Sequence, residues 1–248
     1  MKKLLYITIA ALIFVNVGCK PDEEPEPEIE VSELNLTIDH QFDSVDIDFL
    51  FDFVLPSNEP VIFRRLSYIL GGFYLVNEDG TKQYLKDQYG LIDVRGQKES
   101  VKLENIPMGN YKAIGFSIGL DSAVNHGNPN FYDTDHPLSP INNSLHWSWQ
   151  GGYIFTAVEG KTKSDDESFV FHLAGSQNKI DFEFPIDFTK GYPALNADLT
   201  YNVAEIFRNP NLYNIAIDGS STHNVEDETT KRLIANMVDV LTLNSVHE

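Results

Sequence analysis

The segment "KIDFEFPIDF", residues 179–188, decides the fold class because apolar and acidic residues alternate along it. The apolar residues fall on one face, and they are Ile180, Phe182, Phe184 and Ile186. A period of two predicts a strand with one face buried and the other in water. Pro185 has no N–H to donate to a ladder, so we expect this strand at a sheet edge or at a bulge.

The same alternation recurs in "VDIDFLFDFVL", residues 45–55, and predicts a second half-buried strand. Further strands are expected at residues 34–40, 67–76, 99–106, 111–120, 151–160 and 167–173, separated by turn signals such as Asp79-Gly80. Helical patterns are few: a short turn at 202–210 and one amphipathic segment at 226–241. The sequence therefore predicts an all-β protein, an antiparallel β-sandwich with short helical segments.

The first 30 residues do not resemble a folded domain. Residues 1–18 carry two lysines and then a short apolar run, which predicts a lipoprotein signal peptide. Cys19 is the single cysteine, placed where a lipid-modified cysteine would stand. Residues 19–30 continue as an acidic, proline-rich tether, and residues 31–248 form the expected domain. We therefore expect a protein lipid-anchored to the outer membrane, on its periplasmic or cell-surface side.

The charge of the chain excludes one class of partner. Its formal net charge is −19, and no basic stripe interrupts the acidic surface. A protein that binds nucleic acid needs clustered lysine and arginine for the phosphates, so no nucleic-acid partner is expected. Nucleotide-binding and hydrolase motifs are also absent from the sequence, and we expect no enzymatic activity.

The stretch "SLHWSWQGGYIF", residues 144–155, contains both tryptophans of the chain. Read as one extended strand, it places Trp147, Trp149, Tyr153 and Phe155 on one face and His146 on the other. An aromatic face is typical of a core, whereas the imidazole opposite is not explained by packing. A long polar connection, residues 121–144, leads into this stretch, and such loops are often functional.

The seven histidines show no local metal-binding spacing, so a site would have to be assembled from distant strands. A single inward histidine is usually a hydrogen-bonded core residue. Several imidazoles brought together would suit copper, zinc or nickel. The oxygens of the 121–144 loop would instead suit calcium, although asparagine and aspartate more often serve turns. The residues alone leave these interpretations open.

Several motifs together resemble one family. "LHWSWQGGYIF" is similar to the tryptophan signature of the MbnP-like copper-binding proteins, which are methanobactin-operon partners and occur as lipoproteins in Bacteroidetes. Further resemblance lies in "LTIDHQF", "FRRLSYILGGFYLVNEDG", "IPMGNYKAIGFSIGLD", "VNHGNP", "FVFHLAG" and the terminal "SVHE". The match spans nearly all of residues 33–248.

The resemblance implies a metal site and its residues. The histidines in matching motifs are His40, His126, His146, His172 and His247. The family implies monovalent copper as the ion, and a di-haem MauG-like enzyme as a partner that oxidises a tryptophan, here Trp147 or Trp149. His136 and His223 lie outside the matching motifs and are not predicted as ligands. The alternatives are a structural or interaction lipoprotein without metal and a calcium-binding surface module.

Overall fold

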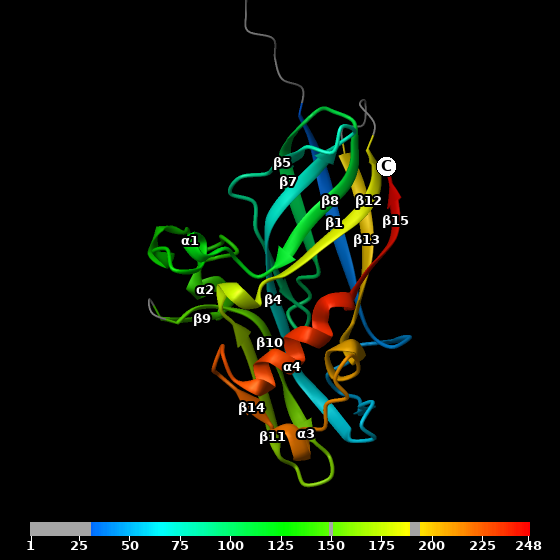
Figure 1. Cartoon of the computed structure of the whole chain (residues 1–248), viewed down its shortest axis with the longest axis vertical. Helices are drawn as coiled ribbons and strands as arrows, with labels where there is room; N and C mark the ends of the chain where they lie inside the picture. Colours follow the sequence, from blue (N-terminus) through cyan, green and yellow to red (C-terminus); the bar gives the residue numbers. More distant parts are fainter. Residues whose placement is uncertain (1–30, 149–150, 189–193) are drawn as a thin grey trace, which may run out of the picture.

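Two packed sheets form the protein in the computed structural model, which describes residues 31–148, 151–188 and 194–248 (Figure 1). The smaller sheet has the order β15-β13-β1-β2, with β7 also paired to β1. Its strands are β1 (Val31–Phe42), β2 (Val45–Asp46), β7 (Ser100–Pro107), β13 (Ala194–Asn202) and β15 (Leu241–His247).

The larger sheet has the order β12-β8-β4-β10-β11-β14. Four short strands extend it: β3, β5 and β6 pair with β4, and β9 pairs with β10. The long strands are β4 (Pro60–Asn77), β8 (Tyr111–Ile118), β10 (Gly152–Thr162), β11 (Ser168–Ala174) and β12 (Ile180–Phe188). The short ones are β3 (Phe53–Val54), β5 (Lys82–Tyr84), β6 (Gly90–Asp93), β9 (His146–Ser148) and β14 (Ser221–Thr222).

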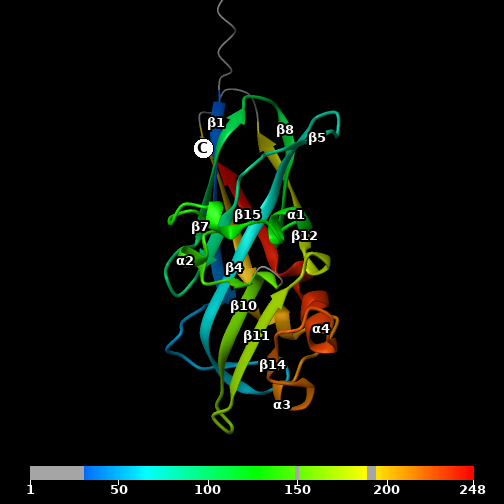
Figure 2. The same ribbon diagram turned by 90° about the vertical axis from the view of Figure 1, so that its left-hand side faces the viewer.

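The predicted sheet-rich fold is confirmed, with one refinement. Most strand pairs are antiparallel, but β1 pairs with β13 and β11 pairs with β14 in parallel. The main core lies between the two sheets, and a ladder of buried phenylalanines crosses it, including Phe63, Phe169 and Phe171. Figure 2 shows β10 and β11 side by side at the end of the molecule where β14 and α3 also lie.

The helices are short and lie in the connections. They are α1 (Ser122–Asn125), η1 (Pro129–Phe131), α2 (Pro140–Asn143), η2 (Ser176–Asn178), η3 (Val203–Phe207), α3 (Ile215–Asp218), α4 (Glu228–Asn236) and η4 (Met237–Asp239). The amphipathic segment predicted at 226–241 becomes α4 and η4, and the Asp227 side chain caps α4 by accepting from the N–H of Thr230. In the described part of the chain, no helix has the length and apolar character needed to cross a membrane.

The strand predicted at residues 179–188 is confirmed, whereas the strand predicted at residues 45–55 was wrong. β12 lies at the end of the larger sheet's strand order, and its pairing with β8 shifts after Pro185, as the missing N–H requires. Residues 45–55 do not form one strand: only β2 and β3 are extended. Asp48 accepts a hydrogen bond from the N–H of Leu50 at 2.7 Å, a local turn that competes with sheet pairing. Leu50 and Phe51 are consequently exposed.

Candidate functional site

The tryptophan stretch forms a hairpin of two strands instead of one extended strand. β9 pairs antiparallel with β10, with Ser148 opposite Gly152, and Gly152 has a φ of +67°. A positive φ suits glycine because it has no Cβ. Tyr153 and Phe155 are fully buried, and Trp147 packs against the same apolar cluster, so the aromatic face does serve packing. Trp149 lies outside the described residues.

That apolar cluster lies on the outer face of the larger sheet, beneath the 121–144 connection. The Tyr153 hydroxyl donates to the carbonyl of Leu138 at 2.7 Å, and the N–H of Tyr153 donates to Asn125 Oδ1 at 2.8 Å. Two of the loop side chains whose oxygens would suit calcium, Asn125 and Asn128, are thus engaged locally, since Asn128 accepts from the N–H of Asn130. The loop residues fasten the connection to the hairpin that presents Trp147.

His172 emerges next to this hairpin from β11. Phe171 and Leu173 point into the main core, so the period of two directs His172 outward, opposite Ala157 of β10. Its Nε2 lies 2.9 Å from Glu159 Oε1, while its Nδ1 is buried without a hydrogen-bond partner. The ring is therefore fixed by one nitrogen and leaves the other unused.

The protonation of this pair follows from its surroundings. Burial opposes the charge of Glu159, but the hydrogen bond from His172 and the Arg65 guanidinium keep the pKa of the carboxyl below its usual value. Burial lowers the pKa of His172, and Glu159 offsets part of that effect. A neutral imidazole beside an ionised carboxylate carries its proton on the nitrogen facing that carboxylate. Nδ1 of His172 consequently holds a free lone pair.

His223 lies directly beside His172, although it is outside the motifs from which the ligands were predicted. Thr222 of β14 pairs in parallel with Phe171 of β11, so the next residue of each strand is also adjacent. The two imidazole centroids are 4.8 Å apart, and the ring planes are almost perpendicular, at 74°. Trp147 lies 6.5 Å from His172 and 6.4 Å from His223 by ring centroids.

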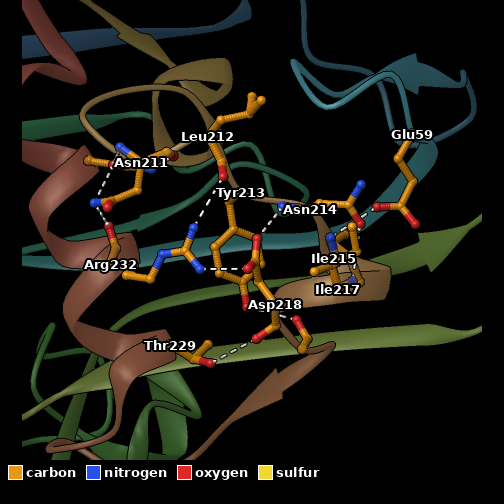
Figure 3. Close-up of polar contacts among 12 residues, drawn as sticks. Glu59, Asn211, Leu212, Tyr213, Asn214, Ile215, Ile217, Asp218, Thr229 and Arg232 are labelled. Carbon is orange, nitrogen blue, oxygen red and sulfur yellow. Dashed lines mark hydrogen bonds and ion pairs between the residues drawn. The ribbon is translucent and has the colours of Figure 1, made fainter.

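A polar network holds the segment that leads to His223 (Figure 3). Arg232 of α4 pairs with Asp218 at 2.6 Å and donates to the carbonyl of Leu212 at 3.2 Å. The hydroxyl of Tyr213 donates to the carbonyl of Gly219 at 2.7 Å. These contacts tie α3 to α4 immediately before β14, so α4 fixes the position from which His223 projects.

A cavity of about 440 Å³ opens beside His223. Its lining includes Trp147, His223 and His126, the residue that ends α1. His126 and His223 are exposed, whereas His172 is half-buried and adjoins the cavity through its ring contacts with Trp147 and His223. We call this cavity, together with the adjoining His172 ring, the histidine cavity.

The other predicted histidines lie elsewhere. His146 is in the same hairpin, but its ring packs edge-on against Tyr153 at 4.6 Å, and its buried Nε2 has no hydrogen-bond partner. His40 is buried in the main core. His247 pairs with Asp198 at 3.0 Å on β15, at the opposite end of the molecule from β14 (Figure 1). Cys19 precedes the described residues.

The described histidines do not make a closed metal site by themselves. Within residues 31–148, 151–188 and 194–248, no three His, Cys, Asp or Glu side chains are grouped closely enough to hold an ion. The His172–His223 pair is nevertheless a suitable start for copper, because imidazole is a good copper ligand. Glu159 supplies the carboxylate that metal-binding histidines usually have behind them.

Comparison with known proteins identifies the family. The chain matches the MbnP family over residues 31–227. It belongs to that family. Among solved structures, it is similar to MbnP from Methylosinus trichosporium, with 16% sequence identity, a TM-score of 0.49, and coverage of 73% of this chain and 78% of the other. The comparison with curated protein sequences gave no match. The predicted MbnP-like resemblance is thus confirmed.

Proposed function

We propose that this MbnP-family protein binds copper at the histidine cavity and captures or delivers the ion outside the cytoplasm. The observation that carries the proposal is the buried, unpartnered Nδ1 of His172, a residue whose ring lies beside the ring of His223. The family resemblance supplies the identity of the ion, since it implies monovalent copper.

The residues present fit such an ion. His172 and His223 would hold the ion through imidazole nitrogens, which are good copper ligands. His126, exposed at the same cavity, could complete the set from α1. Glu159 would keep its hydrogen bond to Nε2 of His172 and raise the basicity of the ring as a ligand. Monovalent copper tolerates low coordination, so this set suffices for capture.

The remaining parts of the proposal follow from the sequence and the family. The lipoprotein-type leader and Cys19 support attachment to the outer membrane. Trp147, at the cavity beside both imidazoles, is the described tryptophan that a di-haem partner could oxidise. An oxidised indole ring would add amine and carbonyl donors to the same cavity. We propose no catalytic activity for the chain itself.

The experiment is a copper titration of the purified chain under reducing conditions, beside His172→Ala and His136→Ala. We expect one tightly bound copper ion in the unmodified chain and in His136→Ala, whose ring stacks on Tyr132 away from the cavity. His172→Ala should bind more than about 100-fold more weakly, because the loss of a ligand exceeds the 10–100-fold cost of losing its outer-shell partner. Equal binding by all three proteins would place the copper elsewhere.

A further inference from the structure

A second cavity, on the same outer face, collects positive charge in an acidic protein. The chain has five arginines and a net charge of −19, yet Arg64, Arg65 and Arg95 all line one cavity of about 610 Å³. Arg64 and Arg65 come from β4, and Arg95 comes from the turn after β6. Three guanidinium groups at one place are not explained by solubility, since the rest of the surface is acidic.

A β-bulge directs two of these side chains to the same face. Glu159 of β10 pairs with Arg65, but its neighbour Gly160 pairs with Phe63, so Arg64 is the extra residue on β4. Phe63 and Leu66, on either side of the two arginines, are both buried in the core. A regular strand would bury one of the arginines, whereas the bulge exposes both outward. The backbone irregularity thus builds the cavity.

The carboxylates in this cavity are already engaged. Glu159 pairs with Arg65 at 3.2 Å and with His172. Asp93 accepts from the Ser67 hydroxyl at 3.3 Å, and a Cβ at Gly96 would lie 2.6 Å from its Oδ2, so the Asp93 side chain packs closely against the turn. Asp93 is thus held against the turn that carries Arg95.

Two of the guanidinium groups have contacts other than ion pairs. Arg95 donates to the backbone carbonyl of Arg64 at 3.1 Å, and its guanidinium carbon lies 5.9 Å from the centre of the Phe49 ring. Within the described ranges, neither Arg64 nor Arg95 forms a direct ion pair with a carboxylate. Lys98 donates to Asn142, another lining residue, at 2.7 Å. The cavity therefore combines two guanidinium groups that form no direct ion pair with two lining carboxylates, Asp93 and Glu159.

We propose that this arginine cavity binds a small oxyanion, a carboxylate or a phosphate group of a small molecule, through Arg64 and Arg95. The planar guanidinium fork matches both groups and forms paired, charge-assisted hydrogen bonds. Arg65 stays paired with Glu159, the carboxylate that also contacts His172. The inference does not depend on copper binding, because none of the anion-binding residues is a proposed metal ligand.

Isothermal titration calorimetry of the purified, copper-free chain tests the proposal, with inorganic phosphate and citrate as separate probes at constant ionic strength. We expect saturable binding of at least one probe, and the tighter probe identifies the preferred group. Arg64→Gln and Arg95→Gln should each weaken that binding at least tenfold. Arg208→Gln is the matched control, because it removes the same charge from an arginine paired with Asp43 and Glu205.

The contrary results are distinct. Absence of saturable binding of both probes by the unmodified chain would overturn the proposal. Equal weakening in Arg208→Gln would do so too, since it would show a general charge effect. Circular dichroism of each variant ensures that lost binding does not reflect lost folding. Because the titration contains no copper, its failure would leave the copper proposal untouched.

Discussion

His40 and His172 each have a carboxylate partner, but only His40 has hydrogen-bond partners on both ring nitrogens. His40 Nδ1 lies 2.8 Å from Glu99 Oε2, and its Nε2 lies 2.9 Å from the Tyr68 hydroxyl. His172 has Glu159 on Nε2 and nothing on Nδ1. Both nitrogens of His40 are used inside the core, whereas His172 keeps an unpartnered Nδ1.

The surroundings of the two rings differ in the same sense. His40 is 2% exposed and packs against Tyr68 and Tyr201, which stack on each other at 5.0 Å. Burial lowers its pKa to about 4, so the ring is neutral in the folded protein at pH 7. His172 has a second imidazole at 4.8 Å. We therefore propose that His40 contributes to the stability of the fold and His172 to ligand binding.

The largest expected effect is a loss of copper affinity on substitution of His223, which was not among the predicted ligands. His223→Ala should weaken copper binding more than about 100-fold, because it removes the second imidazole of the pair. The free energy of unfolding should change little, since the side chain is exposed. Competition titration with a copper(I) chelator measures the affinity. Unchanged affinity would break the assignment of the His172 region.

The next effect is on stability and belongs to His40. His40→Phe keeps a ring between the tyrosines but leaves the Tyr68 hydroxyl and Glu99 without their partner, which should cost about 2 kcal/mol. Urea unfolding measures it, with His247→Gln as a surface control expected within about 0.5 kcal/mol. Copper affinity should be unchanged. A copper loss in His40→Phe would mean that the two regions had been assigned the wrong way round.

A smaller expected change in copper affinity distinguishes a metal ligand, His172, from the residue that supports it, Glu159. Glu159→Gln keeps the size of the side chain but removes the carboxylate that fixes the proton on Nε2 of His172. Copper affinity should fall about tenfold, near the lower end of what outer-shell substitutions cost. The matched variant is Glu99→Gln, which alters the partner of His40 in the same way. Equal losses in both variants would argue against a direct role for Glu159.

The smallest effect is a pH dependence. The pKa of His40 is lower in the folded chain than the ordinary value near 6.5, so the unfolded chain takes up the proton first as pH falls. Stability should therefore decrease from about pH 6.5 towards pH 4. Burial raises the pKa of Glu99, which takes up a proton in the folded state and offsets part of the loss.

The net decrease should be on the order of 1 kcal/mol. Urea unfolding of the unmodified chain and His40→Phe at both pH values isolates it, because Phe does not titrate. A parallel pH profile in the two proteins would show that His40 does not contribute.

Local sequence patterns predicted most of the long strands and the main helix correctly. The alternation at 179–188 and the amphipathic segment at 226–241 gave correct elements, because burial of one face suffices to fix each of them. The same alternation failed at 45–55. There, Asp48 bonds to the local backbone, and no strand of the described chain pairs with the middle of the segment. Period alone does not tell whether a partner strand exists.

For a similar reason, only one of the two neighbouring histidines at the candidate site could be predicted from the sequence. His172 lies in a strand whose pattern is local, and the family resemblance selected it. His223 depends on the parallel pairing of β14 with β11, a contact between segments about 50 residues apart along the sequence. The hydrogen-bond partners of His40 are also distant along the sequence, with Tyr68 28 residues away and Glu99 59 residues away. No spacing in the sequence distinguishes a histidine with two partners from one with a free nitrogen.

Copper K-edge X-ray absorption of the chain loaded with one equivalent of copper(I) tests the central claim most directly. The account predicts imidazole nitrogens at roughly 2 Å from the ion, with the imidazole scattering reduced in His172→Ala and unchanged in His40→Phe. Imidazole scattering that is lost in His40→Phe and retained in His172→Ala would contradict it.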